Sequence, residues 1–149
     1  MTMTQMFAWV MIVFGGLFTG AIFIVAIERV NLWQRMPVEQ YAVDFRRSLY
    51  RLDPLIPILG LISMMGALAF AVGSQGRSAV FAWVGIAFIC VIMIASIVRA
   101  EPMNSKFRKL PEGQAPEGIE QIRTAWRRFH WARTAVALGV LACFAAAIV

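Results

Sequence analysis

Long parts of this 149-residue sequence contain no charged side chain. Asp, Glu, Lys and Arg are absent from Met6–Ile27, Pro54–Gly76 and Ser78–Val98, and Trp131–Val149 contains only Arg133. A helix of about 20 apolar residues crosses the ~30 Å hydrocarbon core of a bilayer. Hydrophobic residues make up 60% of the chain, against roughly 45–50% in soluble domains. The sequence therefore excludes a soluble globular domain and predicts four membrane-spanning helices.

Residue types that bind metals or act as nucleophiles are also scarce. His130 is the single histidine, and the two cysteines, Cys90 and Cys143, lie within apolar segments without a metal or redox spacing. One histidine excludes bis-histidine haem ligation within one chain and the two-histidine, one-carboxylate iron site. We therefore predict no cofactor. A metal held by His130 and Glu28, with further oxygen ligands or across an oligomer interface, is the alternative.

Positive charge is confined to two segments. None of the 14 Lys and Arg residues precedes the first apolar stretch, and only Arg77 lies between the second and third. The others lie between the first and second helices, between the third and fourth, or at helix ends. This bias predicts that both basic segments are cytoplasmic and that both termini lie outside a cell inner membrane. It favours the lipid bilayer as partner and argues against nucleic acid.

The predicted fold class is all-α, an integral membrane four-helix bundle formed by a single transmembrane domain, 1–149. We expect helices at about 6–30, 54–73, 78–99 and 117–149, with the membrane part of the last from about 131. The fourth helix should therefore begin as a cytoplasmic extension, since no proline follows Glu117. Pro102, Pro111 and Pro116 should prevent a single helix in the segment before it.

The first basic segment predicts an amphipathic cytoplasmic helix. Apolar residues recur after Pro37 at helical spacing, at Val38, Tyr41, Phe45, Leu49 and Leu52. Asp53 and Pro54 then indicate an N-cap and the first position of a separate second span.

One face of the first helix contains small and polar residues at intervals of three or four: Gly16, Gly20, Ile24, Glu28 and Asn31. Gly16 and Gly20 form a small-xxx-small element that allows close helix approach, within the bundle or in a homo-oligomer. A carboxylate at the depth of Glu28 is expected to face the bundle interior. The alternative is that Glu28 pairs with Arg29 or Arg35 at the headgroup level.

A candidate site lies where the fourth helix enters the membrane. Arg133 and Thr134 share a helical face with His130, and the topology brings Asn104 and Glu28 to the same mouth. His130 titrates near neutrality and suits a general base, while Arg133 and Asn104 suit an anionic oxygen. The alternative is a structural His130 bonded to a backbone carbonyl. The predicted catalytic residues are His130 and Glu28, and the predicted substrate-binding residues are Asn31, Asn104, Trp126, Arg133 and Thr134.

The sequence resembles the small four-helix membrane family that includes the anthrone oxygenases. The resemblance runs over nearly the whole chain, through the following segments: the Gly-rich first helix ending in Glu28; Met36-Pro37; Arg51-Leu-Asp53-Pro54; Pro102-Met-Asn104; and Arg123-x-x-Trp126-x-x-Phe129-His130-x-x-Arg133-Thr134. The last two are the most specific. The family pattern often has Asn-x-Pro-x-Asn after the third helix, and here Ala100 occupies the first position.

The resemblance implies an oxidoreductase that converts the methylene of an anthrone-like polycyclic phenol to a carbonyl with dioxygen. Such a substrate is a hydrophobic small molecule that partitions into the bilayer. Two alternatives come from other classes: a non-catalytic membrane subunit or small-molecule binder, and a glutathione-transferase-like membrane bundle. The glutathione-transferase-like alternative is supported only by Glu28-Arg29-Val30, since Leu32 stands where that family has an arginine.

Overall fold

The computed structural model describes residues 2–149, and within them four long helical spans and no strand occur. The first span joins α1 (Met3–Ile24), the π-helix η1 (Val25–Val30) and α2 (Asn31–Arg35). The second span is the single helix α3 (Val38–Val72). The third joins α4 (Gly76–Ala95), the π-helix η2 (Ser96–Ala100) and α5 (Glu101–Lys109), and the fourth is α6 (Ile119–Ile148).

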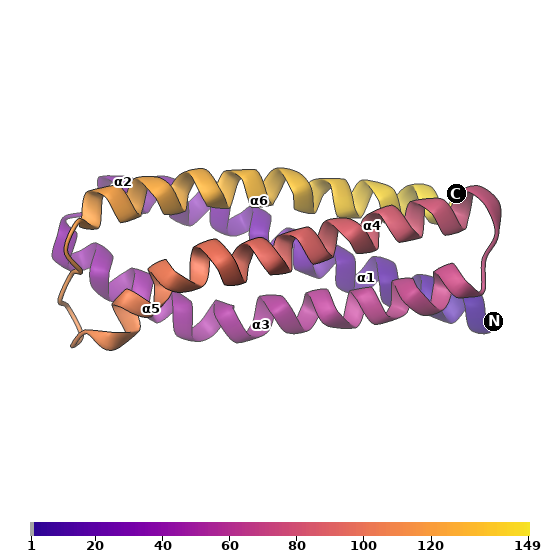
Figure 1. The fold of residues 1–149 in the computed structure, drawn as a ribbon, viewed down its shortest axis with the longest axis horizontal. Coiled ribbons are helices and arrows are strands. Elements are labelled where there is room, and N and C mark those ends of the chain that lie inside the picture. The colour runs from indigo at the N-terminus through magenta and orange to yellow at the C-terminus, as the bar shows by residue number, and fades with distance from the viewer. Residues whose placement is uncertain (1) are drawn as a thin grey trace.

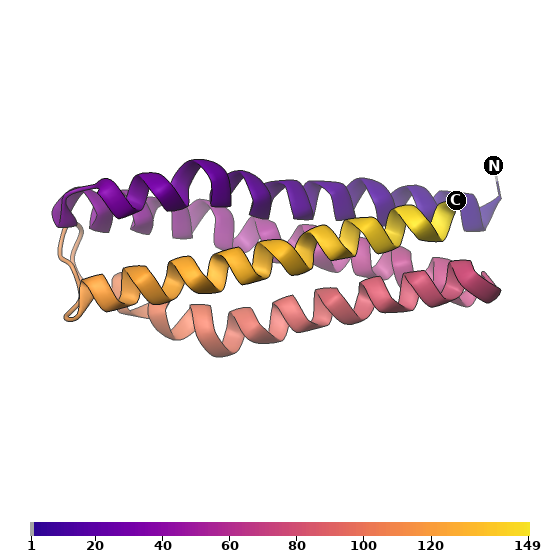
Figure 2. The ribbon, with the colours of Figure 1, turned by 90° about the horizontal axis from the view of Figure 1, so that it is seen from above.

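The spans lie side by side in an antiparallel bundle (Figures 1 and 2). The helix α1 packs on α3 and α6, and α4 packs on the same two helices, so consecutive spans are neighbours around the bundle. Both ends of the chain lie at one end of the bundle, as the views show. We call the opposite end, which carries α2, α5 and the start of α3, the polar end.

Each span is longer than a bilayer requires. The spans contain 30 to 35 residues, and every one includes a window apolar enough to cross a membrane. At 1.5 Å per residue they are about 45–52 Å long, against a ~30 Å hydrocarbon core. The predicted all-α fold is confirmed, and the chain is a multi-pass membrane protein. The surplus length forms the helical extensions of the polar end.

Two buried clusters hold the bundle together. The first fills the apolar part of the spans and includes Phe18, Ile89 and Phe144. The second lies at the polar end and is largely aromatic, with Trp33, Tyr41, Phe45, Phe107 and Trp126 packed edge to face or tilted. Aromatic pairs contribute about 0.5–1.5 kcal/mol beyond their burial, so the extensions form a packed continuation of the bundle.

The predicted helix start at Asp53-Pro54 is wrong, because α3 continues through both Pro54 and Pro57. The amphipathic segment before them is helical, but it forms the first part of this long helix. Its apolar face is buried against the aromatic cluster, with Tyr41 and Phe45 almost fully covered. This packing outweighs the hydrogen bonds that the two prolines remove from the helix.

The third span also extends further than expected, to Lys109. Pro102 lies in the first turn of α5, where the missing N–H of a proline is tolerated. The preceding η2 segment holds the junction together, since the Glu101 N–H donates to the Ser96 carbonyl. The helix ends before Pro111, so only the later prolines act as the predicted breaks. The start of α6 at Ile119 agrees closely with the expected 117.

The face of the first helix that contains Gly16 and Gly20 points away from the bundle. Gly20, Ile24, Glu28 and Asn31 are all exposed, and a Cβ added at Gly16 or Gly20 meets no atom within 4 Å. The inner face is instead formed by Met11, Gly15, Phe18 and Ile22. Association of two copies through the Gly16/Gly20 face stays a prediction, and the face is open for it.

Close helix packing occurs at Gly66 of α3, where we expect the chain to be sensitive to substitution. A Cβ there would lie 2.8 Å from the backbone nitrogen of Met11, so Gly66→Ala must move α1 away from α3. We expect a loss of about 1–3 kcal/mol in the free energy of unfolding. Gly16→Ala, which meets no atom, should be neutral or gain up to about 1 kcal/mol from helix propensity.

Thermal unfolding followed by circular dichroism in detergent tests this pair. We expect a lower unfolding midpoint for Gly66→Ala and an unchanged or slightly higher midpoint for Gly16→Ala. Equal midpoints for the two variants would contradict the close approach of α1 and α3.

Candidate functional site

The polar end contains polar side chains from the second, third and fourth spans, together with one backbone carbonyl of the first span, arranged around Arg133 of α6. The Nη2 atom of Arg133 lies 2.8 Å from Nδ1 of His130. Its Nη1 atom donates to the hydroxyl of Ser96 in η2, at 3.5 Å. The N–H at Nε is buried and has no hydrogen-bond partner. Arg133 therefore uses only two of its five N–H donors in these contacts.

His130 is fully buried between α6 and α1. Its Nε2 atom lies 3.0 Å from the carbonyl oxygen of Ile22. Because a guanidinium only donates hydrogen bonds, Nδ1 accepts from Arg133, so Nε2 bears the proton and donates to Ile22. The ring of Trp126 stacks on the imidazole, with centroids 4.7 Å apart and planes within 14°. The imidazole is therefore neutral, with both nitrogens bonded.

A second chain of bonds connects Trp126 to a carboxylate on α3. The indole Nε1 of Trp126 donates to Oδ1 of Asn104, at 3.2 Å. The Asn104 amide donates in turn to Oδ2 of Asp53, at 3.3 Å. Arg108 also donates to Oδ2 of Asp53 and pairs with Glu101. Both donors to Asp53 thus bind the same oxygen, which leaves Oδ1 available to a substrate.

These residues border a pocket of about 360 Å³ between α3, the third span and α6. Its polar wall includes Asp53, Asn104 and Arg133, and its apolar wall includes Met93 and Ile97. The volume falls within the usual range for small-molecule sites, which combine apolar walls with a few converging polar groups. We call it the Asp53–Arg133 pocket. It offers a carboxylate and a guanidinium to an apolar ligand.

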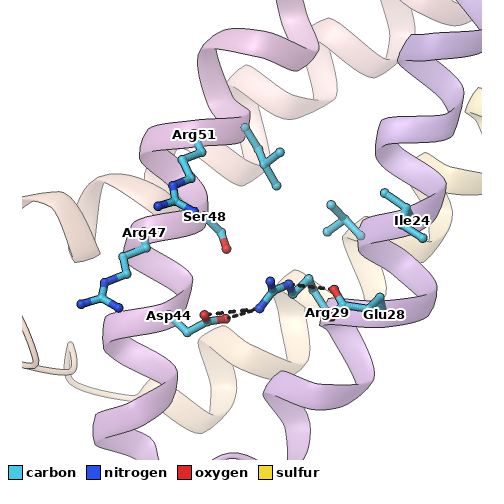
Figure 3. Close-up of a pocket in the computed structure, with 9 residues that line it drawn as sticks. Ile24, Glu28, Arg29, Asp44, Arg47, Ser48 and Arg51 are labelled. Carbon is cyan, nitrogen blue, oxygen red and sulfur yellow. Dashed lines mark hydrogen bonds and ion pairs between the residues drawn. The ribbon is translucent and has the colours of Figure 1, made fainter.

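A different pocket, of about 380 Å³, lies between the first span and α3 (Figure 3). Arg29 lies between two carboxylates there, with Nε 2.7 Å from Glu28 Oε2 and Nη1 3.2 Å from Asp44 Oδ2. Asp44 also accepts from the Trp33 indole, at 2.6 Å. Arg47 and Arg51 of α3 line the same pocket. Glu28 is therefore held by Arg29 in the alternative arrangement that the sequence left open.

The structure brings together part of the predicted site. Asn104 is hydrogen-bonded to Trp126, and His130 to Arg133, and the stacked rings of Trp126 and His130 bring the two pairs together. The hydroxyl of Thr134 donates to the His130 carbonyl within its own helix, at 2.8 Å. The side chain of Glu28 is half exposed in the other pocket, and Asn31 is exposed.

Sequence reasoning missed three residues of this site: Asp53, Ser96 and Arg108. Asp53 was interpreted as a helix cap because a proline follows it. The signal available for it was its place in the Arg51-Leu-Asp53-Pro54 segment. Ser96 and Arg108 carry no comparable local signal, because their contacts arise from the packing of the third span on α3 and α6.

Within residues 2–149, no three His, Cys, Asp or Glu side chains are grouped so that they could hold a metal ion. The two predicted candidate ligands, His130 and Glu28, have separate partners. His130 bonds to Ile22 and Arg133, and Glu28 pairs with Arg29.

The fold and the site define a small four-helix membrane protein with a polar pocket at one end of the bundle. A family model described as anthrone oxygenase matches residues 45–143. The chain belongs to this family. The matched part contains Asp53, Asn104, His130 and Arg133, and it leaves out Glu28 and Asn31. No curated protein and no solved structure matches the chain.

His130 connects α1 to α6, so its removal should destabilise the bundle. His130→Ala removes the bond between the helices to the Ile22 carbonyl, which keeps its bond from the Val25 N–H, and leaves one buried Arg133 donor unpaired; we expect a cost of about 1–3 kcal/mol. Thr134→Val is the matched control, because the bond it removes lies within one helix turn.

Unfolding midpoints in detergent measure the difference between these two variants. We expect a clear decrease for His130→Ala and a small one for Thr134→Val. A His130→Ala protein as stable as the wild type would show that the ring does not hold α1 against α6.

Proposed function

We propose that the protein is an oxidoreductase that uses dioxygen to convert the methylene of a polycyclic, anthrone-like phenol to a carbonyl. The observation that supports it most is the Asp53–Arg133 pocket, which places a carboxylate and a cation beside apolar walls inside the part of the chain that matches the anthrone oxygenase family. The substrate is flat and apolar, so it would reach the pocket from the bilayer, between helices.

The reaction balances without a further reactant. A base removes one methylene proton, and the resulting carbanion is delocalised as an extended phenolate. The carbanion carbon forms a bond to one atom of dioxygen, which is thereby reduced to a hydroperoxide after protonation. Loss of the second C–H proton and cleavage of the O–O bond give the carbonyl and one molecule of water. A carbanion of this kind reacts with dioxygen directly, so the proposal includes no metal and no organic cofactor.

Asp53 is the base that the geometry favours. Its carboxylate lines the pocket, and Arg108 and Asn104 both bind Oδ2, so Oδ1 is left for the substrate proton. A base must lie within hydrogen-bond reach of the proton that it removes. Neither predicted base meets this as well, since both nitrogens of His130 are bonded and Glu28 lines the other pocket.

Arg133 is the group that would stabilise the negative charge that develops on the phenolate oxygen. Its buried Nε–H has no partner in the protein, so it can donate to the phenolate oxygen as charge develops there. Preorganised donors act more strongly in a water-excluded site. His130 then serves as a positioning residue, because its Nδ1 atom fixes the guanidinium. Asn104 connects Asp53 to Trp126 and so holds the base in place.

The polar end is proposed to face the cytoplasm, with both termini outside. The two basic segments of the chain lie at this end, and basic segments are retained on the cytoplasmic side of membranes. The pocket would then lie near the headgroups of the inner leaflet. Ala100 lines the pocket wall. Because the family pattern often has Asn at this position, the change to Ala would alter the shape of the pocket.

Two carboxylate variants test the proposed base. Asp53→Asn keeps the shape of the side chain and its bond from Arg108 but removes the base, so we expect kcat to fall by about 100-fold or more. Glu28→Gln changes a carboxylate of the other pocket and should keep nearly full activity. The measurement is oxygen uptake together with quinone absorbance, on an anthrone in proteoliposomes.

The result also separates the alternatives. Loss of activity in Glu28→Gln with retention in Asp53→Asn would place the chemistry at the predicted carboxylate and contradict the role of Asp53. A wild-type protein that binds the anthrone without oxygen uptake would instead support the non-catalytic binder.

A further inference from the structure

We propose that a small cavity behind the Asp53–Arg133 pocket is the binding site for dioxygen. This inference rests on the proposed function, because it supplies the place from which the second substrate reacts. The cavity has a volume of about 40 Å³ and lies between the first span, α3 and α6. One ordered water needs about 10–15 Å³ measured in this way. The cavity therefore admits a diatomic molecule or a few waters, and it is too small for a phenol.

The walls of the cavity favour an apolar guest. Seven of its ten lining residues are apolar or aromatic, Trp33, Phe45, Leu49 and Trp126 among them. The two indole N–H groups are already used, that of Trp33 by Asp44 and that of Trp126 by Asn104. The polar side chains Ser48, Asp53 and Arg133 complete the lining, and the apolar remainder of the wall is the kind of surface that binds apolar atoms such as xenon.

The position of the cavity suits the reaction. Asp53 and Arg133 line both this cavity and the larger pocket. These two side chains therefore separate dioxygen in the cavity from the phenol in the pocket. When the substrate carbanion transfers an electron, the oxygen molecule becomes an anion. The Arg133 guanidinium lies beside that charge, and its cation stabilises it as it forms. The substrate radical left by the electron transfer and the reduced oxygen then combine into a peroxide anion, which takes up the proton that the base removed and becomes the hydroperoxide.

The cavity borders the pocket of Figure 3. Val25, Ser48 and Leu52 line both, and Ser48 faces the first span. The other residues of that pocket are mostly charged, so it would admit dioxygen from the aqueous side of the polar end while the phenol occupies the opposite side. The two substrates would thus arrive separately, and neither would block the other.

Leu52 and Leu55 provide a matched pair of variants on α3. Leu52 lines the cavity, so Leu52→Phe should fill it. Leu55 is 47% exposed and lies outside the cavity lining, so Leu55→Phe adds the same atoms elsewhere on the helix. The full-length protein in detergent is suitable for both measurements described below.

Xenon binding tests the cavity without depending on activity. Under xenon pressure, the methyl resonances of Val25, Leu49 and Ile56 should shift and saturate in the wild type and in Leu55→Phe. In Leu52→Phe, these resonances should change no more than those of lipid-facing methyl groups, such as the methyl groups of Leu61, which serve as the reference for non-specific effects of xenon. Equal shifts in the two variants, or no saturable shift in the wild type, would overturn the proposal.

Oxygen kinetics with an anthrone then connect the cavity to the reaction. We expect Leu52→Phe to raise KM for dioxygen several-fold, with KM for the anthrone unchanged, and Leu55→Phe to change neither. Activity with an unaltered KM for dioxygen in a folded Leu52→Phe protein would overturn the dioxygen site and leave the proposed function intact. No oxygen uptake by the wild type, with xenon still bound, would overturn the proposed function and with it the assignment of the cavity to dioxygen.

Discussion

The guanidinium of Arg133 is the group on which the arrangement of the polar end depends. Taking a charge out of water costs several kcal/mol unless the protein supplies partners, and α6 places this one among the other helices. His130 and Ser96 bind two of its nitrogens, and Asp53 lines the same pocket. His130 belongs to the same helix, whereas Ser96 and Asp53 come from the third and second spans, so the need to surround one cation fixes α6 against those two spans.

Both π-helical segments lie beside this group. The Ile22 carbonyl that accepts from His130 precedes η1 by three residues, and Ser96, which accepts from Arg133, is the first residue of η2. π-Helical turns inside α-helices occur often at functional sites, where they change the direction of side chains and carbonyls. Here they change the register of the first and third spans at the depth where the polar groups meet. The Arg133 Nε–H is buried at this depth without a hydrogen-bond partner.

The apolar runs were sufficient to predict the four spans, since length and hydrophobicity follow directly from the bilayer. They were not sufficient to predict which face of a span is inside, because lipid is as apolar as a protein core. The Gly16/Gly20 face and Glu28 therefore point outward, contrary to expectation. Local rules also misplaced the start of α3, where packing overrides Pro54. For the site, the family segments indicate Asn104 and His130, whereas Asp53 lies in such a segment but resembles a helix cap, and its contacts with the third span show its place in the site.

In the proposed reaction, a polycyclic phenol binds between the Asp53 carboxylate and the Arg133 guanidinium. The most direct test is an experimental structure of the protein in lipid with an anthraquinone bound, since this product analogue shares the rings and the oxygen atoms of the substrate. We expect the ring system to lie against Met93 and Ile97, with one oxygen within hydrogen-bond distance of Arg133. An anthraquinone bound in the pocket of Glu28 and Arg29, with the Asp53–Arg133 pocket empty, would contradict it.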